Sequence, residues 1–526
     1  MKIEGHQIIG RSIDRNSQSQ SYQAVNPQTG NTITEFKFHS ATEEQMDKAV
    51  ALAVSAHSVY KSTTNHQRAT FLRTIADEIE KIGELLTEHA HAETGLPVGR
   101  LTGERGRTTG QLRMFADWVE EGSYLQATID EALPDRKPLP RADIRKMNHP
   151  LGPVVVFGAS NFPLAFSVAG GDTASALAAG CPVIVKGHPA HPATSELVGK
   201  AIQTAAEITG MPEGVFSLIQ GNTNHTGEYL VMHPGVKAVG FTGSFAGGKA
   251  LYDLAQKRPE PIPVYAEMGS TNPVFILPGA LKARKKDIAT GLSNSINLGA
   301  GQFCTNPGVF VVPPSGDRDS FVKELQESFS GLESQVMLTP DIHQAYTGGA
   351  QRLSQKTSYA VLAQGRESAG KYAARPALFQ VEYAEVKEDK ELTDELFGPS
   401  SIMISADSDD EILEFARSLE GHLTATIHAE KSDGPLVARL LPILQEKVGR
   451  IIFNSYPTGV EVCHAMVHGG PFPATTNSST TSVGTAAIFR FLRPVSYQDI
   501  PDEFLPDALK AGNPLGIRRL VNGKWE

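Results

Sequence analysis

The pattern of apolar and polar residues changes along the 526-residue chain. Near the N-terminus apolar residues recur at helical spacing. The capping box from Thr42 to Gln45 predicts a helix that runs to about Tyr60. A second helix is predicted from about Gln67, and Gly95 should end it. The first 120 residues or so are therefore expected to be largely helical.

From about Gly152 short apolar runs alternate with helical segments. This alternation is typical of βαβ units that build a parallel sheet. Because the predicted strands are continuously apolar, both faces of the sheet should be covered. The predicted strands are 154–157, 183–185, 215–218 and 236–241, and the predicted helices between them are 173–179, 194–209 and 226–232.

A second alternating series begins after about Glu267 and indicates a further α/β domain of roughly 200 residues. Its predicted strands are 272–277, 308–312, 401–404, 423–427 and 450–453, and its helices include 283–298 and 409–418. Two other segments, 136–148 and 490–497, alternate apolar with polar residues. We expect these two segments to pair outside the main sheets.

Composition and charge narrow the class of protein. Hydrophobic residues make up 40% and charged residues 20% of the chain, which suits a packed core. The net charge of −10 argues against nucleic acid as the main partner. The uncharged stretch 150–171 contains prolines and glycines, which favours a strand, a loop and a helix over a membrane span. Three cysteines exclude a disulfide framework and favour a reducing, cytoplasmic location.

Cys304 has the most distinctive setting of the three cysteines. It lies between glycines and a Thr-Asn-Pro turn, which predicts an exposed bend after a helix. Such a cysteine is either a nucleophile or a small packing residue. Cys181 and Cys463 have ordinary settings and are interpreted as packing residues. His464 follows Cys463 directly, and adjacent residues seldom point into one site.

Two charged residues end predicted strands. Glu267 is bordered by small residues and is a candidate general base, with an exposed or ion-paired glutamate as the alternative. Lys186 is a candidate for binding ribose or phosphate, because ligands of open parallel sheets bind beyond the carboxyl ends of strands. The alternative is a solvated lysine.

A glycine-rich turn, residues 241–248, follows a predicted strand and opens a helix. Glycines there would let backbone N–H groups approach a pyrophosphate, although the spacing also fits an ordinary turn. His188 and His191 lack further ligands nearby, so they are interpreted as surface loop residues and no metal is expected.

Six segments, taken together and in this order, resemble the aldehyde dehydrogenase superfamily: 158–163, 185–186, 241–244, 267–269, 301–304 and 395–399. The likeness runs from about residue 20 to 495. Three further segments, 457–475, 480–485 and 490–495, resemble the α-ketoglutaric semialdehyde (2,5-dioxovalerate) dehydrogenase branch, near the NADP-dependent bacterial fatty aldehyde dehydrogenases.

The resemblance implies an α/β fold with a Rossmann-type cofactor domain, an α/β catalytic domain and a small β flap for oligomerisation. It places the NAD(P)-binding domain at 1–134 and 149–266 and the catalytic domain at 267–470. The flap would be 135–148 and 490–500, with 471–489 returning to the cofactor domain and 501–526 as a C-terminal tail. A homodimer or homotetramer is expected.

The resemblance also implies a mechanism. Cys304 would attack the aldehyde carbon, and Asn161 with the Cys304 backbone N–H would hold the resulting oxyanion. Glu267 would activate water to release the acid. The residues implied to bind the cofactor are Lys186, Gly243, Ser244, Gly248, Glu395 and Phe397.

The choice of cofactor depends on what surrounds Lys186. NAD-preferring relatives often carry a glutamate three residues further on, where this chain has Pro189. Without that carboxylate a 2′-phosphate meets no repulsion. The loop 221–225 carries no arginine, however. We therefore expect use of NADP or NAD, with NADP slightly favoured.

The favoured reaction is oxidation of α-ketoglutaric semialdehyde to α-ketoglutarate. The alternatives are a medium- or long-chain fatty aldehyde, a CoA-acylating reaction, which the retained Glu267 argues against, and a non-catalytic binding protein. Residues expected to line the substrate pocket are Phe162, Phe166, Phe303 and Phe472, with Arg107 and Arg113 as candidates for a substrate carboxylate.

Overall fold

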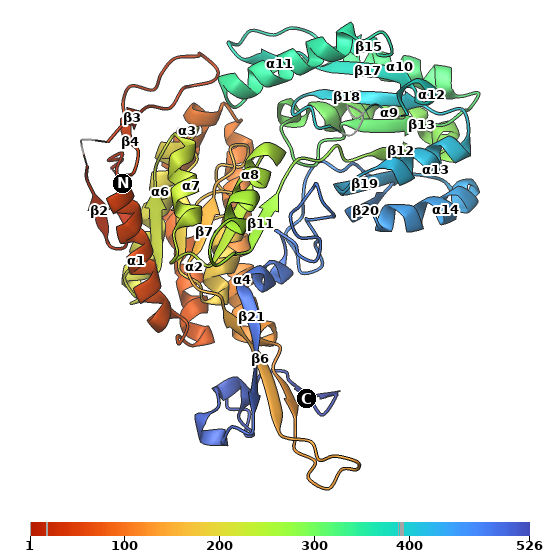
Figure 1. The fold of residues 1–526 in the computed structure, drawn as a ribbon. Helices are drawn as coiled ribbons and strands as arrows, with labels where there is room; N and C mark the ends of the chain where they lie inside the picture. Colours follow the sequence, from red (N-terminus) through yellow and green to blue (C-terminus); the bar gives the residue numbers. More distant parts are fainter. Residues whose placement is uncertain (1, 17–18, 388, 390–393) are drawn as a thin grey trace.

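The computed structural model describes residues 2–16, 19–387, 389 and 394–526. Two seven-stranded sheets form separate α/β bodies, and a five-stranded sheet extends away from the first (Figure 1). Among the described residues, no helix has the length and apolar character needed to span a membrane.

The first sheet has the strand order β11-β10-β7-β8-β9-β1-β2. Its parallel strands are β7 (Val154–Phe157), β8 (Val183–Lys186), β9 (Phe216–Ile219), β10 (Ala238–Thr242) and β11 (Val264–Glu267). The four strands predicted from residue 152 onward are confirmed, with small shifts at their ends. Two short antiparallel strands, β1 (Gln7–Ile9) and β2 (Ser12–Asp14), extend one edge and were not predicted.

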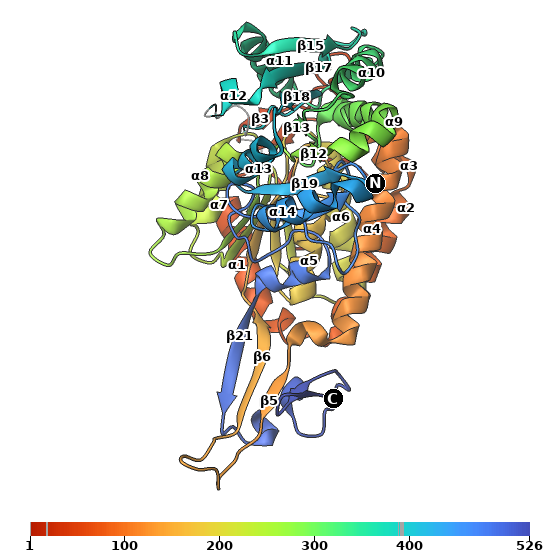
Figure 2. The ribbon, with the colours of Figure 1, turned by 90° about the vertical axis from the view of Figure 1, so that its right-hand side faces the viewer.

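Helices cover both faces of this sheet, as the apolar strands predicted (Figure 2). One face packs against α2 (Asn65–Ile82), α4 (Val98–Glu121), α5 (Gly171–Ala179) and α6 (Pro192–Ile208), and the other against α1 (Glu43–Tyr60), α7 (Asn224–Met232) and α8 (Phe245–Gln256). The capping box at Thr42 is present. The single helix predicted from Gln67 to Gly95 is wrong, because Gly83 has φ +66° and separates α2 from α3 (Glu84–Thr94).

The second sheet has the order β15-β17-β18-β13-β12-β19-β20. Its strands are β12 (Val274–Ile276), β13 (Val309–Val312), β15 (Ala360–Gln364), β17 (Ala377–Glu382), β18 (Ser400–Ser405), β19 (His422–His428) and β20 (Val448–Phe453). Helices α9 (Pro278–Asn297) and α10 (Arg318–Ser330) cover one face, and α13 (Asp409–Ser418) and α14 (Gly434–Gln445) the other. The five predicted strands are confirmed, whereas β15 and β17 at the edge were missed.

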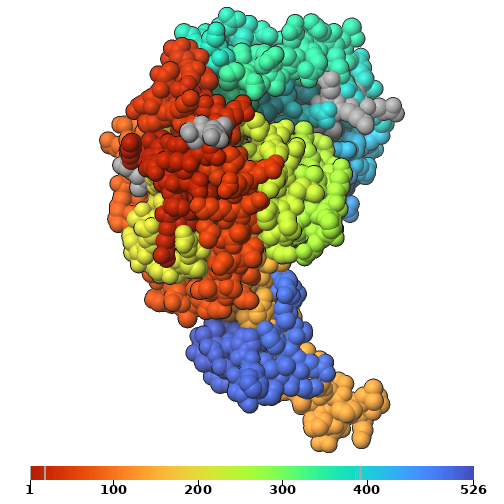
Figure 3. Space-filling view, turned by 60° about the vertical axis from the view of Figure 1, so that its left-hand side comes forward, coloured from red at the N-terminus to blue at the C-terminus, as the bar shows by residue number. Residues whose placement is uncertain are grey.

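The third sheet contains strands from the two segments, 136–148 and 490–497, that we expected to pair outside the main sheets. Strand β21 (Leu492–Gln498) pairs antiparallel with β6 (Ile144–Pro150), and β6 pairs with β5 (Thr128–Asp130). The sheet continues into the C-terminal residues, since β22 (Leu520–Val521) pairs with β5, and β23 (Lys524–Trp525) pairs with β22. Figure 3 shows this sheet projecting from the molecule, with the C-terminal residues in blue. No sequence pattern indicated that the tail would pair here.

A buried ion pair holds the chain just before β21. Arg490, in the 3₁₀ segment η5 (Thr485–Phe491), places Nη1 2.7 Å from Asp172 Oδ1 on α5. Both side chains are almost wholly buried. Arg490 Nη2 also donates to Ser175 Oγ at 3.3 Å. The pair thus ties the start of the projecting sheet to the core of the first body.

We predict that Arg490→Met lowers the free energy of unfolding by about 3–5 kcal/mol, because it leaves the Asp172 carboxylate buried without its cation. Thermal and urea unfolding measure this change. The control is Arg439→Met, which removes an exposed partner of Asp410 and should change stability little. Equal losses in the two variants would contradict the prediction.

Candidate active site

The strand register of the first sheet brings the candidate residues together at the carboxyl ends of its parallel strands. Phe157 on β7 pairs with Lys186 on β8 and with Phe241 on β10, and Thr242 pairs with Glu267 on β11. These pairs all stand at the carboxyl ends of their strands. The strand order also reverses between β7 and β10, which is where ligands of doubly wound sheets bind.

Glu267 is a buried carboxylate with two direct partners. Its Oε1 lies 2.8 Å from His468 Nε2, and Ser482 Oγ donates to its Oε2 at 2.6 Å. Burial alone would raise the pKa of Glu267. The charge of His468 and the hydrogen bonds from His468 and Ser482 outweigh burial and hold that pKa below its ordinary value.

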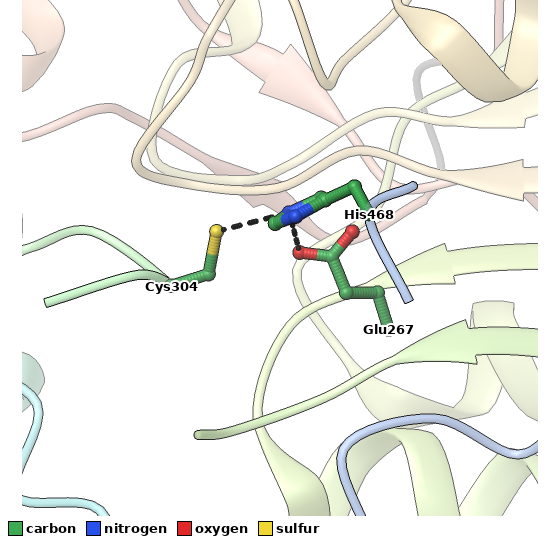
Figure 4. Close-up of side chains that lie close together, drawn as sticks. All are labelled: Glu267, Cys304 and His468. Carbon is green, nitrogen blue, oxygen red and sulfur yellow. Dashed lines mark hydrogen bonds and ion pairs between the residues drawn. The ribbon is translucent and has the colours of Figure 1, made fainter. Parts of the chain in front are cut away.

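Cys304 lies beside the same histidine, on a tight bend that follows α9. Its Sγ is 3.3 Å from His468 Nε2 (Figure 4). Gly301 in the bend has φ +65°, and a Cβ there would lie 2.1 Å from the carbonyl oxygen of Gly398. Asn272 Nδ2 also donates to the Cys304 carbonyl at 2.9 Å. The bend therefore depends on glycine, and the thiol is held in a fixed place.

The Cys304 thiol is neutral in this arrangement. Burial and the adjacent Glu267 carboxylate raise the pKa of Cys304 well above its ordinary value. A reactive thiolate therefore requires transfer of the proton to a nearby base. The Glu267–His468 pair is within reach of the sulfur and can serve as that base.

The three groups together also form a donor set that a metal ion such as zinc could use, since their ligand atoms lie within 4.8 Å of one another. A 2.8 Å ion pair joins His468 to Glu267, and a 3.3 Å hydrogen bond joins it to Cys304. These contacts are those expected of a thiol, an imidazole and a carboxylate that exchange a proton.

Asn161 lies next to the Cys304 bend. Its side-chain Nδ2 donates to the backbone carbonyl of Gln302 at 3.1 Å, and its backbone carbonyl accepts from Arg100 Nη2 at 2.8 Å. An amide nitrogen carries two hydrogens, so one remains for a ligand. Asn161 is thus fixed from two sides near the place where an oxyanion would form.

Three of the predicted aromatic residues form one cluster beside these groups. Phe162 lies 5.3 Å from Phe166 and 5.5 Å from Phe303, measured between ring centroids. Phe166 lies 6.2 Å from the His468 ring. The cluster gives the Cys304 region an apolar wall.

Two residues predicted to line the pocket lie elsewhere. Phe472 is 55% exposed and packs edge-on against Phe245 at the start of α8. Arg113 is on the surface of α4 and pairs with Asp77 at 2.9 Å. The sequence placed both near the site because it does not show which way a loop or a helix face turns.

The glycine turn after β10 fits a bound dinucleotide. Gly243 and Ser244 are exposed at the N-terminus of α8, where Ser244 Oγ accepts from the Gly247 backbone N–H. A Cβ at Gly248 would lie 2.7 Å from Met268, so glycine allows α8 to approach β11 closely. An open helix N-terminus of this kind favours phosphate.

The other cofactor candidates border the same region. Lys186 is half-buried and makes no ion pair among the described residues, and burial lowers its pKa to about 8. An anionic ligand would relieve that cost. Glu395 reaches Gly269, where a Cβ would lie 2.5 Å from its Oε2. Glu395 and Phe397 line a cavity that also includes Gly301. These residues fit NAD(P).

The interpretation of His188 and His191 as surface residues is wrong for His191. It is fully buried, with Nε2 3.0 Å from the Ala159 carbonyl and Nδ1 3.2 Å from Ser195 Oγ. His188 is half-buried and stacks on it. Both therefore pack behind the loop that follows β7.

His468, Ser482 and Arg100 were not predicted as site residues. His468 and Cys304 are separated by 164 positions, so no local spacing links them. The available signal was the segment 457–475, which carries the closer resemblance and contains His468.

The fold and this site define an NAD(P)-dependent aldehyde dehydrogenase, and a sequence profile of the aldehyde dehydrogenase family matches residues 14–478. The chain belongs to that family. It is 51% identical to α-ketoglutaric semialdehyde dehydrogenase 2 of Azospirillum brasilense over the whole of both chains. It is 49% identical to α-ketoglutaric semialdehyde dehydrogenase of Acinetobacter baylyi, over 93% of each chain.

A solved betaine aldehyde dehydrogenase of Staphylococcus aureus has the same fold. The TM-score is 0.80 at 19% sequence identity, covering 96% of this chain and 98% of the other. The predicted α/β fold of the superfamily is thereby confirmed.

We predict that Glu267→Gln speeds alkylation of Cys304 by iodoacetamide at pH 7.5. The Glu267 charge raises the pKa of Cys304, so removing it lowers that pKa and increases the thiolate fraction, about tenfold for each pKa unit. Mass spectrometry of the Cys304 peptide measures the rate, with the Cys463 peptide as internal control. A slower or unchanged rate at Cys304 would show that Glu267 does not suppress thiolate formation.

Proposed function

We propose that this enzyme oxidises α-ketoglutaric semialdehyde to α-ketoglutarate with NADP or NAD. The observation that carries the proposal is the position of the Cys304 sulfur, 3.3 Å from a histidine that is paired with a buried glutamate. The names of the two relatives near 50% identity support the choice of aldehyde.

In the first step Cys304 gives its proton to the Glu267–His468 pair, and Sγ attacks the aldehyde carbon. The carbonyl oxygen becomes an oxyanion. The free N–H of the Asn161 amide and the backbone N–H of Cys304 stabilise it. This addition gives a tetrahedral carbon from which hydride can leave.

Bound NAD(P) supplies the hydride acceptor. Loss of hydride from the adduct leaves a thioester on Cys304. The Glu267–His468 pair passes the Cys304 proton to solvent, and Glu267 then takes a proton from water, whose oxygen attacks the thioester carbon. The C–S bond breaks, which releases the carboxylic acid, and the departing sulfur takes the proton from Glu267. Aldehyde, water and oxidised cofactor are thereby converted to acid, reduced cofactor and one proton. Because Glu267 is present for this step, we favour hydrolysis over transfer to CoA.

NADP is favoured slightly over NAD, for an electrostatic reason. Lys186 has no carboxylate partner among the described residues, so a 2′-phosphate near it would meet an unpaired cation. Asn222, in the loop before α7, and His225, in the first turn of α7, are exposed, and His225 already lies 3.1 Å from Glu43. A strong preference for the phosphate is therefore not expected.

The location and assembly belong to the same proposal. All three cysteines are free, which supports a reducing cytoplasm. Strand β21 lies at an edge of the projecting sheet, and Leu139 in the adjoining loop is 69% exposed. An open strand edge with apolar residues beside it favours pairing with a second copy, as a homodimer or homotetramer.

A panel of aldehydes tests the proposed reaction. We expect kcat/KM for α-ketoglutaric semialdehyde to exceed that for hexanal and decanal by about tenfold or more, since the charged substrate gains polar contacts that they lack. Absorbance of the reduced cofactor at 340 nm measures turnover, and Cys304→Ala should abolish it. A higher kcat/KM for decanal would favour the fatty aldehyde alternative.

We predict that Lys186→Met raises KM for NADP about tenfold or more and KM for NAD by less, because the lysine charge acts on the additional phosphate. Steady-state kinetics with both cofactors measures the change. Lys237→Met, which removes a surface partner of Glu260, is the control. An equal rise in KM for NADP and NAD would show that Lys186 does not interact with the 2′-phosphate.

A further inference from the structure

One face of α4 carries three charged residues spaced one turn apart: Arg100, Glu104 and Arg107. Positions i, i+4 and i+7 lie on the same side of a helix. Arg100 donates to the Asn161 carbonyl at 2.8 Å, and Glu104 accepts from the backbone N–H groups of residues 164 and 165 at 2.9 and 3.0 Å. Two of the three residues therefore hold the loop that follows β7.

Arg107, the third residue, makes no such bond. Its Nε and Nη2 are buried and have no hydrogen-bond partner among the described residues. These two nitrogens form one edge of the guanidinium, the edge that binds a carboxylate through two parallel hydrogen bonds. Burial of these donors without an acceptor is costly, and it lowers the pKa of Arg107.

The guanidinium lies beside the aromatic cluster that borders the reacting groups. Its carbon lies 5.1 Å from the Phe166 ring centroid, and that centroid lies 6.2 Å from the His468 ring, which contacts Cys304. The charge of Arg107 also acts on both Cys304 and Glu267. Arg107 is therefore one aromatic ring away from the residues around Cys304.

Arg450 is another arginine whose charge acts on Cys304. Its Nη2 already donates to the carbonyls of Pro457 and Gly459, at 2.9 and 3.0 Å. Arg450 therefore holds a loop, and it has no pair of free N–H groups that could bind a carboxylate through two hydrogen bonds. Arg107 is the better candidate for binding a ligand.

We propose that the Nε and Nη2 edge of Arg107 is a carboxylate-binding subsite, which selects aldehydes with an acid group at the far end of a short chain. This inference rests on the proposed function. The aldehyde and carboxylate carbons of a five-carbon semialdehyde are about 5 Å apart when extended, at about 1.5 Å per bond. Such a substrate carries its acid group at the end away from the aldehyde, as simultaneous binding at Cys304 and Arg107 requires.

The test compares Arg107→Met and Arg107→Lys with three five-carbon aldehydes: α-ketoglutaric semialdehyde, glutaric semialdehyde and pentanal. We expect Arg107→Met to lower kcat/KM about 100-fold or more for the two carboxylated aldehydes and less than about threefold for pentanal. Arg107→Lys should restore part of the loss, since lysine keeps the charge without the fork.

Arg113→Met, on the exposed side of the same helix, is the matched control and should change none of the three values. An equal loss for pentanal and the semialdehydes, or no change in their ratio, would overturn the subsite. A wild-type preference for pentanal over α-ketoglutaric semialdehyde would instead overturn the proposed substrate. In that case the ratio for glutaric semialdehyde still tests Arg107. Melting temperatures of all variants separate loss of folding from loss of binding.

Discussion

A buried contact of 2.8 Å between His468 and Glu267 joins parts of the chain that are far apart in sequence. Glu267 is the last residue of β11, in the first sheet. His468 lies in the segment after β20 that leads from the second sheet back to the first. The same segment is bonded along β11, where Met268 N donates to Ala474 O and Thr476 N to Ala266 O. Since Cys304 contacts the same histidine, the relative position of the two bodies sets the surroundings of the Cys304 sulfur.

This arrangement also sets the electrostatics of the site. Glu267 is kept ionised by His468, and its charge in turn keeps Cys304 protonated. The half-buried thiol is a poor target for oxidants and electrophiles in this state, because the thiolate is the reactive form. In the proposed mechanism the sulfur becomes reactive when a substrate carbonyl lies close enough to be attacked as the proton leaves.

Much of the fold could be predicted from sequence, because continuous apolar runs such as Val154–Phe157 permit few other structures. The helix break at Gly83 and the C-terminal strands β22 and β23 could not be predicted. Such short elements are fixed by contacts with residues far away in the sequence. Within the site, motifs located Cys304, Glu267 and Asn161 along the chain. They did not indicate that Phe472 faces solvent or that His468 joins the cluster, because both depend on how remote loops turn.

The position of His468 has a consequence for the order in which the protein is made. Domains generally fold as they leave the ribosome, N-terminal part first. Strand β11 and the Cys304 bend are synthesised well before the segment that carries His468. During that interval Glu267 has no imidazole to pair with, so a nascent chain holds Cys304 and Glu267 without the histidine that contacts both. The cluster of three side chains is therefore completed only when the segment that carries His468 docks.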